Sequence, residues 1–177
     1  MNEKDIQFVL GKHLFLNNVC IPNVSMYCPG HTEYEADFVY FSMKTQFLTE
    51  VEIKTNFQDF KDDFNKKRYH DCKNVKYLYY AMPRTLYNTY RETIDSMLGD
   101  AGLILIDEST TLNHGVQYSF GGFVKRAKER ENWYSLSPTG LLHYLRIGCM
   151  KWVTIALYGL IISLVFEIGR ASCRERV

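Results

Sequence analysis

Residues 35–54 read EADFVYFSMKTQFLTEVEIK, and this stretch decides the fold. Two runs rich in β-branched and aromatic residues, 35–43 and 47–54, are separated only by Lys44-Thr-Gln46. A connection this short cannot support a parallel crossover, so the two runs are predicted to form an antiparallel hairpin. Its register places Asp37 opposite a position between residues 52 and 54.

The second strand of this hairpin carries an unusual row of charges. Side chains alternate across a strand, so Glu50, Glu52 and Lys54 share one face, whereas Val51 and Ile53 share the other. The two aliphatic residues indicate that their face is core. Three charged groups on the opposite face of a central strand require water, a metal or one another.

Hydrophobic spacing predicts further elements on both sides of the hairpin. Pro22 indicates that the first predicted strand, residues 19–27, is an edge strand or is bulged. Gly99 is typical of the end of a helix. The predicted helices cover residues 3–15, 57–70 and 86–98, and the further predicted strands cover residues 19–27, 75–82 and 101–107.

This order of elements, αβββαβαβ, predicts an α/β domain with a mixed sheet flanked by helices. The strand at 101–107, AGLILID, is apolar throughout and is expected to be buried on both faces. Residues 108–135 contain a Gly121-Gly122 break and a basic run at 125–130, and no element is predicted there. The basic run fits either a solvated loop or an arm that contacts nucleic acid.

A hydrophobic C-terminal segment follows. Ser137-Pro138 is a typical helix start, and the helix behind it is predicted to pack on the domain. Residues 150–166 are almost uncharged and just long enough for a membrane span, so a membrane anchor is the less favoured alternative. The side chains expected to cover one side of this helix are Leu141, Leu142, Leu145, Ile147 and Trp152.

Residues 167–177, EIGRASCRERV, resemble a translated sequencing adapter and are interpreted as non-native. The predicted organisation is therefore a domain over 1–135, a hydrophobic helical segment over 136–166 and this tail.

Composition is that of one globular domain. The 177 residues are 46% hydrophobic and 23% charged, and the formal net charge is +1, so any nucleic-acid surface must be a local patch. The N-terminus does not resemble a signal peptide, and five cysteines without a CxxC pair favour a reduced, cytoplasmic location. Cys28-Pro-Gly-His31 has the spacing of a zinc half-site, but a turn is the favoured interpretation.

The hairpin itself offers chemistry. Asp37 and Glu52, together with a main-chain carbonyl, would make a hard oxygen site suited to Mg²⁺. Lys54, one pleat further, could hold the attacking water or steady phosphoryl charge. The alternative is a solvated strand face with an ordinary Glu–Lys ladder.

The spacing also resembles a known signature. Asp37, fourteen intervening residues and then Glu52-Ile53-Lys54 are similar to the D…(D/E)xK pattern of the PD-(D/E)XK nuclease superfamily, although Ala36 stands where the motif has Pro. Residues 33–108 resemble the MmcB-like DNA repair proteins in particular. The similar stretches are Glu35-Ala-Asp37, Glu50-Val-Glu-Ile-Lys54, Asp59-Phe60-Lys61-x-Asp63, Lys67-x-x-His70, Tyr79-Tyr80-Ala-Met-Pro83 and Ala101-Gly-Leu-Ile104.

This resemblance implies a restriction-endonuclease-like fold with an αβββαβ core. It also implies a Mg²⁺- or Mn²⁺-dependent deoxyribonuclease that hydrolyses phosphodiester bonds in DNA repair or processing, without a small-molecule cofactor. Asp37, Glu52 and the Ile53 carbonyl would bind the metal, with Lys54 as the catalytic lysine. Glu3, from the first helix, would be a further carboxylate ligand.

Three more residues are candidates for positioning or phosphate contacts, namely Glu50, Lys67 and His70. For the last two, a helix C-terminus where cations meet the helix dipole is an equally good interpretation. Two other functions stay open: a DNA-binding domain of the same fold that does not cleave, and a membrane-tethered interaction protein.

Overall fold

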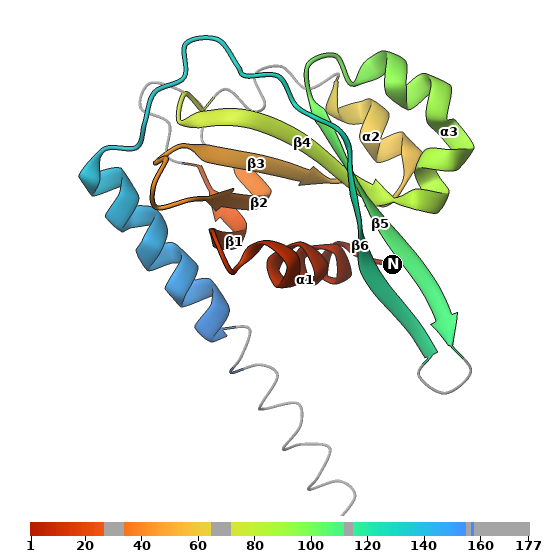
Figure 1. Cartoon of the computed structure of the whole chain (residues 1–177), viewed down its shortest axis with the longest axis horizontal. Coiled ribbons are helices and arrows are strands. Elements are labelled where there is room, and N and C mark those ends of the chain that lie inside the picture. Colours follow the sequence, from red (N-terminus) through yellow and green to blue (C-terminus); the bar gives the residue numbers. More distant parts are fainter. Residues whose placement is uncertain (27–33, 65–71, 112–114, 155–156, 158–177) are drawn as a thin grey trace, which may run out of the picture.

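The computed structural model describes residues 1–26, 34–64, 72–111, 115–154 and 157, and it shows an α/β architecture built on one six-stranded mixed sheet (Figure 1). The strands follow one another across the sheet in chain order, from β1 to β6. The elements are α1 (Glu3–Leu14), β1 (Val19–Ser25), β2 (Glu35–Phe41), β3 (Leu48–Ile53), α2 (Phe57–Asp63), β4 (Val75–Pro83), α3 (Arg84–Met97), β5 (Gly102–Thr111) and β6 (Gly115–Lys125).

The predicted hairpin is confirmed. β2 and β3 pair antiparallel, with Phe38 opposite Val51 and Val39 opposite Glu50. Extending this register by one residue sets Asp37 opposite Glu52, at one end of the predicted range. β1 pairs with the other side of β2 and forms an edge of the sheet, as Pro22 predicted.

Helical crossovers connect the central strands, so β3, β4 and β5 run parallel. The first half of β5, residues 102–106, is buried on both faces, as expected from its sequence: Leu103 and Leu105 pack with α3, whereas Ile104 and Ile106 pack with α1. The carboxyl ends of the three parallel strands therefore meet at one edge of the sheet, which is where ligands bind in open α/β sheets.

The two faces of the sheet are covered by different helices (Figure 1). Ile6 and Leu10 of α1 pack on Val51 and Ile53 of β3. The opposite face carries α2 and α3, whose Phe60 and Ile94 belong to one core cluster with β4 and β5. Since β3 alternates, its charged side chains project toward the α2 face.

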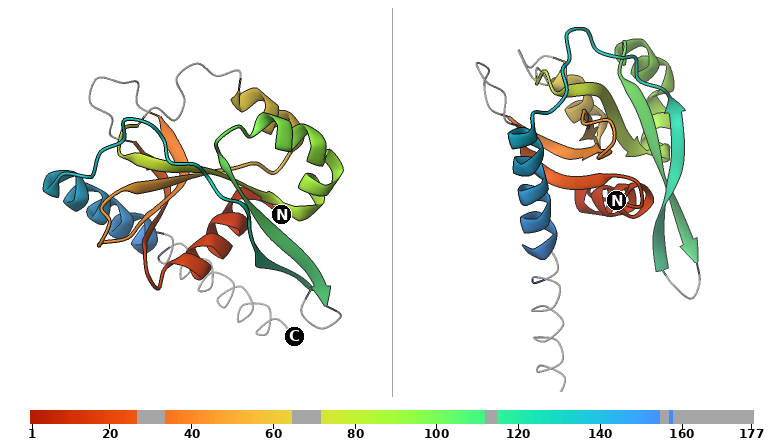
Figure 2. Two further views of the ribbon diagram at one scale, coloured as in Figure 1. Left: turned by 45° about the horizontal axis from the view of Figure 1, so that its top comes forward. Right: turned by 60° about the vertical axis from the view of Figure 1, so that its left-hand side comes forward.

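The strand β6 was not predicted, and β5 is longer than expected. Together they form a ribbon that extends beyond the rest of the sheet (Figure 2). β6 is hard to predict from the sequence because its pairing with β5 is irregular at two places, opposite Leu103/Ile104 and opposite Leu105/Ile106. The second irregularity lies at the Gly121-Gly122 pair. Gly122 has a φ of 111°, and a Cβ at Gly121 would lie 2.7 Å from a guanidinium nitrogen of Arg84. The glycines interpreted from the sequence as a break are thus part of the strand.

A helix over residues 138–154 lies along the side of the sheet near β1 and β2 (Figure 2). The Ser137 hydroxyl accepts a hydrogen bond from the Gly140 amide at 3.0 Å, which is the predicted N-cap. Tyr144 is 1% exposed in the β1–β2 core, and the Trp152 indole donates to the Cys20 carbonyl at 2.6 Å. The packing side is Leu141, Tyr144, Leu145, Ile147 and Trp152.

One residue of the predicted packing side was wrong. Leu142 is 67% exposed, because Tyr144 rather than Leu142 fills the contact with the sheet. The segment 155–156, the residues 158–177 and the second half of the helix predicted over 57–70 lie outside the described residues. Within the part of the chain that the structure does describe, no helix combines the length and apolar character needed to cross a bilayer.

The difference between Tyr144 and Leu142 gives a test of how the C-terminal helix docks. Tyr144→Ala should lower the free energy of unfolding by about 3 kcal/mol, because it opens a cavity in the β1–β2 core. Leu142→Ala should change it by less than about 0.5 kcal/mol, because the side chain is mostly in water. Urea denaturation of the two variants measures both values, and equal losses would contradict this docking.

Candidate functional site

The candidate site lies at the carboxyl end of β3, where β2 runs beside it and α2 follows. The Asp37 carboxylate accepts a hydrogen bond from the Ile53 backbone amide at 2.7 Å. The Glu52 side chain is close enough to lower the pKa of Asp37. The two carboxyl groups that the sequence predicted to face each other therefore lie side by side.

Lys54 adjoins this pair. Its ammonium lies 3.3 Å from a Glu52 carboxylate oxygen and 3.1 Å from an Asp63 carboxylate oxygen. Glu52 and Lys54 are only 3% and 4% exposed. The Tyr80 hydroxyl donates to the other oxygen of Asp63 at 2.8 Å, so the partner of Lys54 is itself held in place.

Burial and neighbouring charges set the protonation of these groups. Burial raises the pKa of Asp37, and the Ile53 amide and Lys54 ammonium offset this only in part. Burial by itself lowers the pKa of Lys54, but Glu52 and Asp63 more than compensate, and the net shift is upward. Lys54 therefore remains an ammonium ion at neutral pH.

Glu3 approaches the same place from α1. An Asn2–Asp5 capping box starts this helix, and Glu3 accepts hydrogen bonds from Gln7 at 2.9 Å and Asn23 at 3.4 Å. Gln7 also donates to the Asp37 carbonyl at 2.9 Å, which ties α1 to β2. Burial, and then the negative charge of Asp37, raise the pKa of Glu3.

The donor set fits Mg²⁺ of the kind that keeps several waters. Asp37 and Glu52 provide two hard oxygen ligands, and such an ion commonly uses only one or two protein carboxylates. Carboxylates that share one buried site favour a proton or a cation beside them. Among the described residues, no three His, Cys, Asp or Glu side chains are grouped to hold a metal, so Glu3 does not complete a three-carboxylate set in this arrangement.

The remaining candidates fall elsewhere. Glu50 is fully buried and accepts a hydrogen bond from the Tyr34 hydroxyl at 2.7 Å. Lys67, His70 and the Cys28–His31 half-site lie outside the described residues. Glu50 is thus engaged within the core, one pleat before Glu52.

Sequence reasoning missed two members of the cluster, Asp63 and Tyr80. Both residues were named only within stretches that resemble the MmcB-like proteins, and neither was given a role. Asp63 stands three positions after the buried Phe60 and so shares its inward face. The ion pair had a signal in the sequence. Lys54 ends a strand, and Asp63 lies on the buried face of the helix that directly follows it.

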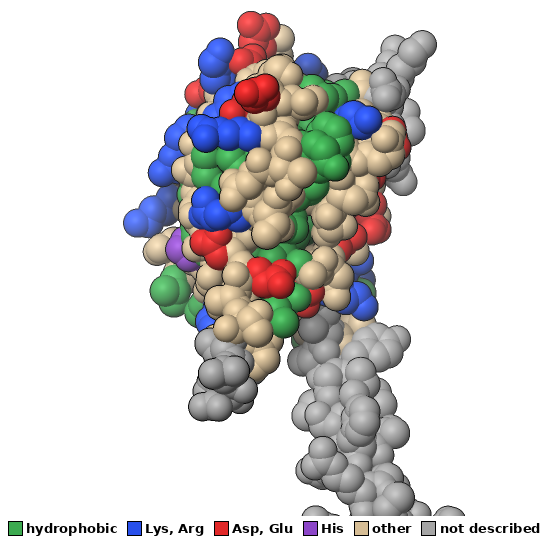
Figure 3. All heavy atoms as spheres, turned by 90° about the vertical axis from the view of Figure 1, so that its right-hand side faces the viewer, with side chains coloured by type: hydrophobic (Ala, Val, Ile, Leu, Met, Phe, Trp, Pro, Cys, Tyr) green, Lys and Arg blue, Asp and Glu red, His purple; other side chains and the backbone are tan. Residues whose placement is uncertain are grey.

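The basic run at 125–130 is partly neutralised by its own neighbours. Lys125 donates to the Gly99 carbonyl at 2.5 Å, and Lys128 lies 2.8 Å from an Asp100 carboxylate oxygen. Figure 3 shows Lys and Arg side chains gathered toward one side of the face that carries α3 and the β5–β6 ribbon, with acidic side chains among them. The run is therefore an interrupted basic patch.

Neither a scan against protein-family models nor a search of curated proteins finds a match to this chain.

The Lys54–Asp63 pair can be measured by a double-mutant cycle. Lys54→Met and Asp63→Asn should each destabilise the fold, by about 3 kcal/mol for Lys54→Met, because removing one partner leaves a charge buried without compensation. The double variant should lose less than the sum of the two, with a coupling of about 1–3 kcal/mol. Denaturant unfolding at pH 7 gives all four free energies, and strict additivity would show that the pair is not coupled.

Proposed function

We propose that this protein is a metal-dependent phosphodiesterase of the PD-(D/E)XK type that acts on DNA. The observation that carries the proposal is the β2–β3 register, which sets Asp37 opposite Glu52, with the ammonium of Lys54 3.3 Å from a Glu52 oxygen. The order of α1, β1 to β3, α2 and β4 is compatible with the restriction-endonuclease-like core that the resemblance implies.

In this mechanism, Asp37 and Glu52 would hold Mg²⁺ or Mn²⁺. The ion would act as a Lewis acid and lower the pKa of a bound water. Lys54 donates hydrogen bonds to the attacking water or to a phosphoryl oxygen on which negative charge develops. Because its charge is retained at neutral pH, it can do so without a preceding proton transfer.

Asp63 and Tyr80 act through Lys54. A lysine side chain has four rotatable bonds, and the Asp63 carboxylate restricts where its ammonium lies. The Tyr80 hydroxyl fixes Asp63 in turn, and the pKa of Tyr80 is raised by burial and by Asp63, so it stays a donor. Both are therefore positioning residues, and their loss should weaken the reaction less than the loss of a metal ligand.

A second candidate is a DNA-binding domain that does not cleave. The burial of Glu52 and Lys54 favours this second candidate, because the two side chains already form an ion pair with each other. In that case the cluster would hold β3 against α2 and would have no chemical role.

Cleavage assays separate the two. With supercoiled, single-stranded and branched DNA, the protein should nick in Mg²⁺ or Mn²⁺ and not in EDTA. Asp37→Asn and Glu52→Gln should each reduce the rate by roughly 100-fold or more, and Asp63→Asn by roughly tenfold to 100-fold. Glu92→Gln, which replaces an exposed carboxylate on α3, is the matched control and should leave the rate unchanged.

Circular dichroism should show that each variant keeps its secondary structure. Intact DNA with every substrate and metal, or cleavage that persists in Glu52→Gln, would overturn the nuclease proposal. Binding of DNA that is unaffected by Asp37→Asn, without cleavage, would establish the second candidate.

A further inference from the structure

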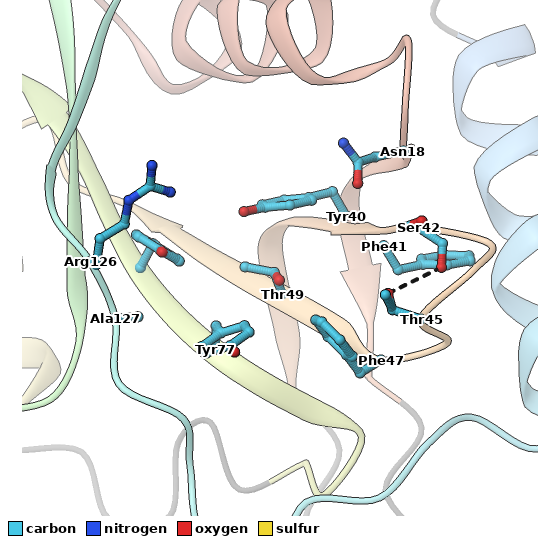
Figure 4. A pocket seen from close by; sticks show the side chains of 11 residues that line it. Asn18, Tyr40, Phe41, Ser42, Thr45, Phe47, Thr49, Tyr77, Arg126 and Ala127 are labelled. Carbon is cyan, nitrogen blue, oxygen red and sulfur yellow. Dashed lines mark hydrogen bonds between the residues drawn. The ribbon is translucent and has the colours of Figure 1, made fainter.

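A pocket of about 420 Å³ lies on the other face of the sheet, away from the carboxylates (Figure 4). Tyr40 and Thr49, which pair across β2 and β3, form part of its floor. Tyr79 of β4 also lines it and belongs to the core beneath α1. The pocket is near the start of β3, whereas Glu52 and Lys54 stand at the end of that strand.

Aromatic rings make its walls. Tyr77 and Phe47 are both half-buried, and their ring centroids are 5.6 Å apart in an edge-to-face arrangement. Phe47 packs in the same way on Trp133, with centroids 5.5 Å apart, and this holds it in position. The Lys76 ammonium lies over both rings, 4.9 Å from the Phe47 centroid and 5.5 Å from the Tyr77 centroid. Aromatic rings that line a pocket can stack on a planar group, and such stacking accepts any nucleic-acid base.

The geometry of the wall depends on Gly102. A Cβ at this position would lie 2.3 Å from the Tyr79 ring and 2.7 Å from the backbone nitrogen of Ala127. Only glycine allows both to approach β5 this closely. Because Ala127 follows Arg126 directly, this contact also fixes where Arg126 leaves the sheet.

Arg126 stands at one end of the pocket, and the Tyr40 hydroxyl points toward it (Figure 4). Its guanidinium lies 4.8 Å from the centroid of the Phe123 ring. Arg84 and Arg91 have carboxylate partners, Asp107 and Asp95. Within the part of the chain that the structure describes, Arg126 has no such partner, so its charge is available to an anion.

Hydroxyl and amide groups also line the pocket (Figure 4). Tyr40 and Thr49 lie opposite each other on β2 and β3, and the Asn18 amide lines the same space. Burial raises the pKa of Tyr40, so its hydroxyl stays protonated at neutral pH. The pocket therefore offers aromatic rings, neutral hydrogen-bonding groups and the cation of Arg126.

We propose that this pocket binds one nucleotide, with its base against Tyr77 and Phe47 and its phosphate paired with Arg126. Arginine is well suited to phosphate because its planar fork can make two parallel hydrogen bonds. The volume of about 420 Å³ falls in the range of small-ligand pockets. The nucleotide is either free or one unit of a nucleic-acid strand, and the inference does not depend on the nuclease proposal because it uses none of the carboxylate residues.

Isothermal titration calorimetry in EDTA tests the site with four probes: dAMP, deoxyadenosine, inorganic phosphate and a five-residue oligodeoxyadenylate. Saturable binding is expected for dAMP, for the oligonucleotide or for both, and neither deoxyadenosine nor phosphate should bind as tightly. Binding of dAMP identifies a free nucleotide as a sufficient ligand. Binding of the oligonucleotide alone identifies a nucleic-acid strand as the source.

Arg126→Gln should weaken the binding by about tenfold or more, because it removes the charge-assisted bonds to phosphate. Tyr77→Leu should weaken it by a similar factor through loss of stacking. Arg91→Gln is the matched control, since Arg91, like Arg126, is exposed and lies over an aromatic ring, and it should bind as the wild type does. Absence of binding by both nucleotide probes, or equal affinity of Arg126→Gln and the wild type, would overturn the proposal.

Discussion

Lys54 is a cation held almost entirely out of water, and the carboxylates around it balance the free energy of its desolvation. Glu52 comes from the same strand, but Asp63 comes from α2, so this ion pair also fixes the helix against the sheet. Tyr80 then connects α2 to β4 through Asp63. The end of β3 is thus defined by electrostatics, whereas the rest of the strand is defined by apolar packing.

β3 has one charged face and one apolar face, and this difference explains how much of the region the sequence predicts. Alternation gave the face of each charged side chain, and the three-residue connection placed Asp37 opposite a position between residues 52 and 54. The structure selects Glu52 from that range. Those relations are local, so a short stretch of sequence contains them. Asp63 was missed because its partner is nine positions away across a turn, and only the packing of Phe60 shows that it faces inward.

Elements whose form depends on distant partners were harder to predict. β6 contains glycines inside its run, and its regular pairing becomes visible only when β5 lies beside it. Leu142 and Tyr144 are both compatible with a packing face, and only the position of the β1–β2 core decides in favour of Tyr144. Hydrophobic periodicity identifies a helix and an approximate face, but it does not identify which ring enters the core.

The irregular ladder of β6 also bears on how the protein behaves in a crowded solution. In the described part of the chain, β6 pairs on one side only, with β5, and so forms an outer strand of the sheet. An outer strand exposes a row of backbone groups that a second molecule could extend, which is a route to aggregation. The two bulges interrupt that row, and Lys125 places a charge near its end. The glycines that obscure β6 in the sequence thereby help to keep the sheet from growing.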